Sequence, residues 1–294
     1  MRRTAAADGN AKEYIMPDIG FVNGRFMPLE EATVPVEDRG FQFGDGIYEV
    51  IRTYHGQPFE LDAHLARLER SARAIELPLP WNLQQWAAYV HDGIKRGGHA
   101  ESKVYLQLTR GVAPRDHVFP ASTKPTAVMT VREMRTIEPA LQASGVAVMT
   151  MDDWRWGRCD IKSVNLLPNV LARQTAKQAG AFEALFIRNG QLTEGSVSNV
   201  MVVKTGRLLT APEGERILSG VTRTIVLELA RKESLPVEER FVTRDELSHA
   251  DEIFLTGTTV EVLPVIRVDG KPVGSGKPGP ASLKLQTAFQ RFVD

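Results

Sequence analysis

The feature that most constrains the fold is the order in which hairpin-like and helix-like segments follow one another. The pair Phe21-Val22 precedes an Asn-Gly turn at 23–24, and the strand-like run 47–54 precedes His-Gly-Gln at 55–57. Such turns join antiparallel strands. Residues 62–76 then carry apolar side chains at spacings of three and four, which predicts a helix. Because hairpins and helices mix without a regular strand-helix-strand alternation, the sequence predicts an α+β fold.

The same patterns divide the chain of 294 residues into two parts. Further helices are predicted at 82–96, 165–178 and 222–232, and strands at 103–109, 126–131, 146–151, 183–188 and 198–203. The periodicity lapses into charged and Pro-containing sequence around 133–142, which favours a domain boundary there. We therefore expect a domain at 17–137, a second at 138–294, and a loosely ordered extension at 1–16.

Composition excludes several classes of partner. Lys and Arg together number 36 and so do Asp and Glu, so the balanced charge argues against binding to nucleic acid or to an anionic membrane surface. No apolar run approaches the ~18 residues of a membrane span, and no signal peptide follows Arg2 and Arg3. A single cysteine, Cys159, suits a reducing compartment. We expect a cytoplasmic protein with a small-molecule partner and no metal site.

Two charged residues suggest the chemistry. Lys162 follows the apolar Ile161 in a segment with two tryptophans, and an apolar setting favours the neutral amine that attacks an aldehyde to form a Schiff base. Glu194 lies among small polar residues at a turn between strands, where a carboxylate can keep a pyridinium nitrogen protonated. On local sequence alone, a salt bridge between Lys162 and Asp160, and a solvated Glu194, are the alternatives.

Two further segments favour anion binding. Residues 218–223 lead into an apolar-periodic helix, whose first N–H groups and dipole attract a phosphate, with Arg67 as an additional cation. A helix cap by Ser219 or Thr222 explains the same residues. The long loop 111–125 contains Arg115 and His117, and such loops tend to carry function.

Four motifs, in order, resemble those of the fold-type IV aminotransferases. They occupy residues 38–50, 158–163, 193–199 and 218–223, and the resemblance extends from about residue 19 to the carboxyl end. It implies a smaller amino-terminal α/β domain and a larger carboxyl-terminal domain, with pyridoxal 5'-phosphate (PLP) at their interface. The catalytic lysine would be Lys162. The resemblance assigns cofactor binding to Arg67, Lys162, Glu194, Ser198, Asn199, Leu218, Val221, Thr222 and Thr258.

Within this family, the loop Arg110 to His117 is most similar to that of the D-amino acid aminotransferases. The resemblance implies that Arg115, His117 and Tyr48 hold the substrate carboxylate, and that the loop reaches the neighbouring subunit of a homodimer. A guanidinium suits this task because its fork donates two hydrogen bonds to one carboxylate. One departure is Gly257, where the relatives tend to carry a hydroxyl residue.

The expected reaction is a ping-pong transamination of D-amino acids through the Lys162 Schiff base, with D-alanine and 2-oxoglutarate as substrates and pyruvate and D-glutamate as products. Three alternatives share the cofactor motifs: a branched-chain L-amino acid aminotransferase, an (R)-amine transaminase and an aminodeoxychorismate lyase. A non-catalytic binding protein on the same scaffold is a fourth, and it is disfavoured because both Lys162 and Glu194 are present.

Overall fold

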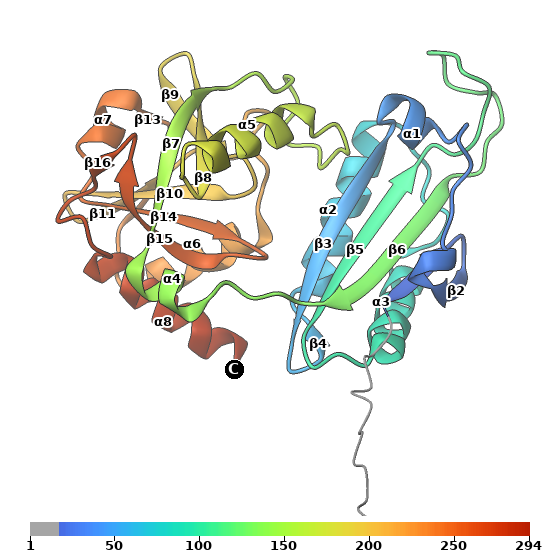
Figure 1. Ribbon diagram of the computed structural model, residues 1–294, viewed down its shortest axis with the longest axis horizontal. Coiled ribbons are helices and arrows are strands. Elements are labelled where there is room, and N and C mark those ends of the chain that lie inside the picture. Colours follow the sequence, from blue (N-terminus) through green and yellow to red (C-terminus); the bar gives the residue numbers. More distant parts are fainter. Residues whose placement is uncertain (1–17) are drawn as a thin grey trace, which may run out of the picture.

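The computed structural model describes residues 18–294, so the predicted extension at 1–16 lies outside the described residues. Two β-sheets, each covered by helices, stand beside one another and are joined by a single extended connection (Figure 1). The sheets are formed by residues 19–133 and 146–272 respectively. The mixed order of hairpins and helices predicted from the sequence is therefore confirmed, whereas the division into domains at residue 137 stays a prediction.

The first sheet has the strand order β2-β1-β6-β5-β3-β4, and all its pairs are antiparallel. Its strands are β1 (Ile19–Val22), β2 (Arg25–Pro28), β3 (Gly46–Tyr54), β4 (Gln57–Pro58), β5 (Ser102–Thr109) and β6 (Thr126–Glu133). Asn23 and Gly24 both have positive φ, as the tight turn between β1 and β2 requires. Side chains on β5 and β6 alternate between buried and partly exposed, so each strand turns one face to the core.

Helices α2 (Leu61–Ala74) and α3 (Leu83–Gly97) cover the inner face of this sheet. The predicted amphipathic spacing is what buries Leu65 and Leu68 of α2, and Trp86 of α3 is completely buried. Asn82 begins α3 with a capping box, since its side chain accepts from the Gln85 N–H. Two short elements, η1 (Leu29–Glu31) and α1 (Arg39–Phe43), precede β3.

The second sheet is larger and mixed, with the order β12-β11-β10-β14-β15-β7-β8-β9-β13 and with β16 paired to β15. Strands β7, β8 and β15 run parallel to one another, while most other pairs are antiparallel. Its strands are β7 (Val146–Asp152), β8 (Glu183–Arg188), β9 (Gln191–Gly195), β10 (Asn199–Lys204), β11 (Arg207–Thr210), β12 (Val237–Glu239), β13 (Val242–Thr243), β14 (Glu252–Gly257), β15 (Glu261–Val268) and β16 (Lys271–Pro272).

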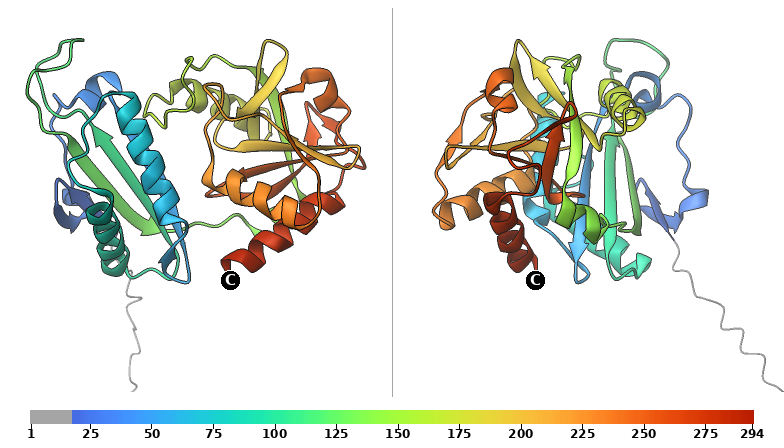
Figure 2. Two further views of the ribbon diagram at one scale, coloured as in Figure 1. Left: turned by 180° about the vertical axis from the view of Figure 1, so that it is seen from behind. Right: turned by 60° about the vertical axis from the view of Figure 1, so that its left-hand side comes forward.

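The helices of the second half pack on different parts of this sheet (Figure 2). Helices α6 (Val221–Lys232) and α8 (Pro280–Val293) share one apolar core with β10 and β14, and α5 (Leu167–Gln178) packs against β7 and β8. Helix α7 (Arg244–Ser248) follows β13. Helix α4 (Pro139–Ser144), which was not predicted from the sequence, begins within the segment 133–142 that was interpreted as a boundary. Within residues 18–294, no helix has the length and apolar character needed to traverse a bilayer.

Candidate active site

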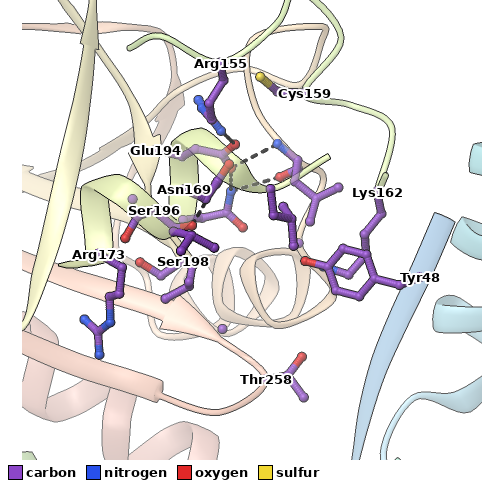
Figure 3. Close-up of a pocket in the computed structure, with 18 of the residues that line it drawn as sticks. Tyr48, Arg155, Cys159, Lys162, Asn169, Arg173, Glu194, Ser196, Ser198 and Thr258 are labelled. Atoms are coloured by element: carbon purple, nitrogen blue, oxygen red, sulfur yellow. Dashed lines mark hydrogen bonds and ion pairs between the residues drawn. The ribbon is translucent and has the colours of Figure 1, made fainter. Parts of the chain in front are cut away.

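A cavity of about 780 Å³ lies where the two halves of the protein face each other. Its walls come from β3 and α2 of the first half and from β9, α5, α6 and several loops of the second (Figure 3). The cavity brings together every candidate residue of the cofactor site and one of the substrate site. They are Tyr48, Arg67, Lys162, Glu194, Ser198, Asn199, Leu218, Val221, Thr222 and Thr258.

Lys162 is positioned by a loop of the second half that pairs with a strand of the first. Its carbonyl accepts a hydrogen bond from the Tyr48 N–H at 2.9 Å, and its own N–H donates to Ser71 Oγ at 3.2 Å. The next residue, Ser163, forms an isolated bridge with Ile47 on β3. The Lys162 Nζ lies 4.3 Å from the centre of the Tyr48 ring (Figure 3). The backbone around Lys162 is therefore held by both halves, and its amine borders the cavity.

Glu194 is buried at the end of β9, across the cavity from Lys162 (Figure 3). Its Oε2 accepts hydrogen bonds from Asn199 Nδ2 and from the Leu218 N–H, each at 3.0 Å, and its Oε1 accepts one from Arg155. Burial raises the pKa of Glu194 because it removes the carboxylate from water, while Arg155 and the Leu218 N–H oppose that shift. A further cation or hydrogen-bond donor would therefore stabilise the ionised form of Glu194.

Arg155 divides its guanidinium between two carboxylates. Its Nε and Nη2 each donate to Asp153 at 2.9 Å, and its Nη1 donates to Glu194. Asp153 also forms an ion pair with Arg188 at 3.1 Å. Burial opposes ionisation of Asp153, but the hydrogen bonds and charge of Arg155 outweigh it and lower the pKa of Asp153. The positive charge of Arg155 is therefore divided between Glu194 and Asp153.

Arg67, which also lines the cavity, belongs to a second buried cluster. Its Nε and Nη2 donate to the two oxygens of Glu49, each at 2.8 Å, and its Nη1 donates to the Ser219 carbonyl at 2.8 Å. His64 Nδ1 also lies 2.8 Å from Glu49 Oε2. Burial would raise the pKa of Glu49, but Arg67 and His64 hold it well below its usual range. Burial lowers the pKa of His64, which favours its neutral form.

The start of α6 supplies the donors of an anion site. Gly220 is the N-cap residue and provides no side-chain cap, so the first N–H groups of the helix have no partner within the helix. The alternative explanation, a cap by Ser219 or Thr222, is wrong, since Gly220 occupies the N-cap position and Ser219 Oγ donates to Glu213 at 2.6 Å instead. A side chain at Gly220 would collide with Asn199. Helix dipole, free amides and Arg67 together favour a phosphate here.

The chemical groups on these walls fit PLP. An aldehyde carbon needs a primary amine, which Lys162 provides, and a phosphate needs the α6 amides and Arg67. A basic ring nitrogen needs an anionic partner, which Glu194 provides. The three requirements are met on separate walls of one cavity, so the residues present suit a molecule with all three groups.

Gly257 ends β14 and also lines the cavity, beside Thr258. A Cβ added to it would lie 3.4 Å from Val260 Cγ2 and 3.7 Å from the Val197 carbonyl oxygen, which are ordinary van der Waals distances. Its φ lies outside the left-handed region. Glycine at this position is therefore required neither by the space nor by the backbone.

Arg115 and His117 do not line the cavity of their own chain. The Arg115 guanidinium lies 4.4 Å from the centre of the Phe43 ring and donates to the Gln42 carbonyl at 3.3 Å. The His117 ring centre lies 5.3 Å from that of Phe43. Both side chains are exposed, on a loop that projects from the first half (Figure 1). The structure keeps these two residues together but separates them from Tyr48 and Lys162.

Neither of the two buried charge clusters was predicted from the sequence. A signal existed for one of them, because His64 and Arg67 are three residues apart on a predicted helix and share a face. Glu49 alternates with Tyr48 along β3, so the two point to opposite sides of the sheet. No local pattern marked Arg155, which lies in an irregular loop and meets Glu194 only in the folded chain.

Comparison with known proteins identifies the group that shares this arrangement. A family model described as amino-transferase class IV matches residues 46–268. A D-alanine aminotransferase of Bacillus licheniformis is 46% identical over 271 residues, covering 92% of this chain and 95% of that protein. One of Listeria monocytogenes is 42% identical over 271 residues, covering 91% and 93%.

Solved structures share the fold. A branched-chain amino acid aminotransferase of Escherichia coli superposes with a TM-score of 0.88 at 27% identity and covers 94% of this chain and 95% of its own. A branched-chain aminotransferase of Thermoproteus uzoniensis, solved with norvaline, gives a TM-score of 0.86 at 27% identity, with 94% of both chains covered. Another structure of a branched-chain amino acid aminotransferase contains pyridoxamine 5'-phosphate and superposes with a TM-score of 0.88 at 27% identity over 95% of both chains. The expected architecture, a smaller and a larger half with the cavity between them, is confirmed.

Proposed function

This chain belongs to the PLP-dependent class IV aminotransferase family, and we propose from that premise that it transfers amino groups between D-amino acids, D-alanine among them, and 2-oxo acids. The observation that carries the proposal is the near full-length similarity to D-alanine aminotransferases, joined to the convergence of Lys162, Glu194 and the start of α6 on one cavity. The products from D-alanine and 2-oxoglutarate would be pyruvate and D-glutamate.

Each wall has a distinct task in this reaction. When bound, PLP supplies the aldehyde that accepts the amino group and the ring that withdraws electrons from the substrate Cα. Lys162 Nζ, beside the Tyr48 ring, would remove the proton from the substrate Cα and deliver it to the cofactor. Glu194 holds a proton on the ring nitrogen, and its three protein donors fix its position. Arg67 and the α6 amides hold the phosphate, with Ser198, Asn199 and Thr258 on the surrounding wall.

The substrate carboxylate needs a cation, and the cations of the loop 111–125 do not reach the cavity of their own chain. We infer a homodimer in which Arg115 and His117 of one chain reach the cavity of the other, next to Tyr48. In support, both residues are exposed and are kept beside Phe43, away from their own cavity. Large apolar side chains on α5, a helix that lines the cavity, are also exposed, among them Leu167 at 68% and Val170 at 59%. A cytoplasmic location completes the proposal.

Mixing two inactive variants tests this exchange. Lys162→Ala lacks the amine, and Arg115→Ala lacks the loop cation. If the loop reaches the neighbouring cavity, a hybrid dimer has one complete site, formed by the Lys162 of one chain and the Arg115 of the other. We expect activity to reappear after the two variants are unfolded together and refolded. Absence of recovery would place Arg115 in its own chain's site or outside any site.

A half-reaction tests the substrate. Protein loaded with PLP is mixed separately with D-alanine, L-alanine and L-leucine, and the absorption of the bound cofactor is followed. We expect D-alanine alone to shift the band to shorter wavelength, and Lys162→Ala to abolish the shift. A response chiefly to L-leucine would instead indicate a branched-chain L-amino acid aminotransferase, the activity named for the structural relatives. A response to none would favour the amine transaminase or the lyase.

A further inference from the structure

Arg173 is a cavity residue that the proposed reaction leaves unused. It lies on α5 and lines the same cavity as Lys162 and Glu194. Two other arginines line that cavity, and each already has a buried carboxylate partner, as described above for Arg67 and Arg155. Within residues 18–294, Arg173 makes no hydrogen bond or ion pair, and its Nη1 is buried without a partner.

The surroundings of Arg173 preserve this cation rather than neutralise it. Phe182 covers one face of the guanidinium at 4.6 Å from the ring centre. Lys177, one turn further along α5, lines the same wall and adds positive charge. The nearby acid, Glu183, uses its Oε1 for the Val197 N–H at 2.7 Å and for Ser198 Oγ at 3.0 Å. Its Oε2 is buried without a partner, and the charge of Arg173 opposes the rise that burial causes in the pKa of Glu183, but the two side chains form no ion pair. A half-buried guanidinium with unused donors costs free energy unless an acceptor arrives.

The position of Arg173 separates it from the groups that handle the reacting end of the substrate. In Figure 3, Tyr48 and Lys162 lie on one side of the cavity and Arg173 on the other, with Ser196 and Ser198 between them. With the α-carboxylate next to Tyr48, as in the proposed function, the other end of a substrate whose Cα lies near Lys162 can extend toward α5. The cavity volume of about 780 Å³ leaves room for such a side chain beside the cofactor.

We propose that Arg173 forms a subsite for the distal carboxylate of five-carbon dicarboxylic substrates, 2-oxoglutarate as amino acceptor and glutamate as its amino form. The inference rests on the proposed function and deepens it. Arginine suits the task because its planar fork donates two hydrogen bonds to one carboxylate, whereas a short apolar side chain such as that of D-alanine ends before it reaches the subsite.

The first test compares two acceptors in the cofactor-loaded enzyme, with D-alanine as donor. For Arg173→Gln we expect the KM for 2-oxoglutarate to rise between about 10-fold and about 100-fold, the loss typical of a hydrogen bond to a charged group. The KM for 2-oxobutanoate, which has no distal carboxylate, stays unchanged. Arg173→Lys retains part of the affinity because it keeps the charge without the fork. Arg207→Gln, which removes an exposed arginine on β11, is the matched control and behaves as wild type.

A binding measurement avoids turnover altogether. Glutarate and butyrate are titrated into cofactor-loaded wild type and Arg173→Gln while heat is recorded, and thermal unfolding of each variant confirms that it is folded. Wild type should bind glutarate more tightly than butyrate, and Arg173→Gln should bind both equally. If Arg173→Gln kept the preference for glutarate, or raised both KM values equally, the subsite would be refuted.

The two proposals fail in different ways. A wild-type enzyme that transaminates D-alanine while Arg173→Gln treats both acceptors as wild type does would refute only the subsite. If the wild-type protein does not transaminate D-alanine, but Arg173→Gln abolishes its preference for glutarate, the proposed function is refuted and the subsite is retained.

Discussion

Two buried arginine–carboxylate clusters border the cavity, and they differ in the number of carboxylates to which each arginine donates. Arg67 donates to both oxygens of Glu49 and to no other carboxylate. Arg155 donates to Asp153 and Glu194. As a result, the pKa of Glu49 lies well below its usual range, whereas that of Glu194 is raised. Both carboxylates are buried, so the difference arises from their partners.

This contrast separates a structural carboxylate from one prepared for a ligand. Glu49 has a complete set of protein partners, and its removal would leave Arg67 buried without compensation. Glu194 shares Arg155 with Asp153, so a protonated ring nitrogen beside Glu194 would supply positive charge that its protein partners do not fully provide. The same reasoning identifies Arg173, which pairs with no carboxylate of the described residues 18–294, as the place for an incoming anion.

The largest effect on stability should come from Glu49→Gln. Breaking a buried pair by removing one partner leaves an uncompensated charge, and we expect a loss of about 3–5 kcal/mol in the free energy of unfolding. Urea unfolding of the cofactor-free protein measures it. The control is Glu69→Gln on α2, whose exposed pair with Arg73 spans 3.6 Å and should contribute only about 0.3–0.5 kcal/mol. Similar losses in both variants would remove the distinction between the clusters.

Glu194→Gln should show the converse, a loss of rate with a smaller loss of stability. The amide keeps the shape but cannot hold a proton on the ring nitrogen, so we expect kcat/KM for D-alanine to fall by about 10²- to 10³-fold, as when one preorganised electrostatic partner is removed. Arg155 keeps Asp153 as its partner, which limits the cost in unfolding free energy. Near wild-type kinetics would contradict the assignment of Glu194.

The pH dependence of stability should reveal His64. Its pKa in the folded protein is lowered from the ordinary 6.5, so below that pH the unfolded chain binds the proton more readily than the folded chain. Stability is therefore present above pH 6.5 and declines as the pH falls, by up to about 1.4 kcal/mol per unit of pKa difference. Unfolding free energies at neutral and mildly acidic pH test this.

His64→Gln should flatten that decline, because the amide does not titrate. His55→Gln, with a side chain 70% exposed, is the matched control and should leave it unchanged. The Glu49 pair adds a loss in the same direction at lower pH, since a depressed pKa stabilises only above the ordinary value of 4.5. An unaltered slope in His64→Gln would show that other groups carry the acid sensitivity.

The smallest effect should follow Gly257→Ser. Because the added Cβ meets only ordinary contacts, we expect the free energy of unfolding to change by no more than about 0.5 kcal/mol. A serine hydroxyl beside Thr258 adds one donor near the phosphate end, so release of PLP during dialysis should slow. Faster release would indicate that glycine leaves room that the cofactor needs.

Local structure was accessible from the sequence where one short segment decides it. The Asn23–Gly24 turn, the apolar spacing of α2 and the start of α3 at Asn82 all follow from backbone preferences within a few residues. The motifs also identified Lys162 and Glu194 as residues of one chemistry. The helix α4 was missed because it is short, begins with a proline and lies in a polar segment without periodicity.

The sequence by itself determined which chemical groups the cavity contains, because amine, carboxylate and helix-start residues are properties of residue type and local order. Only the tertiary structure decided which charges are paired. Arg67 meets the Ser219 carbonyl 152 positions away, and Arg155 meets Glu194 39 positions away. Charge pairing depends on distances of a few ångströms between residues remote in the chain, and on burial that removes water. Neither quantity follows from a local sequence pattern. The pairing of Arg155 with two carboxylates, and the lack of a partner for Arg173 within residues 18–294, are therefore visible only in the folded structure.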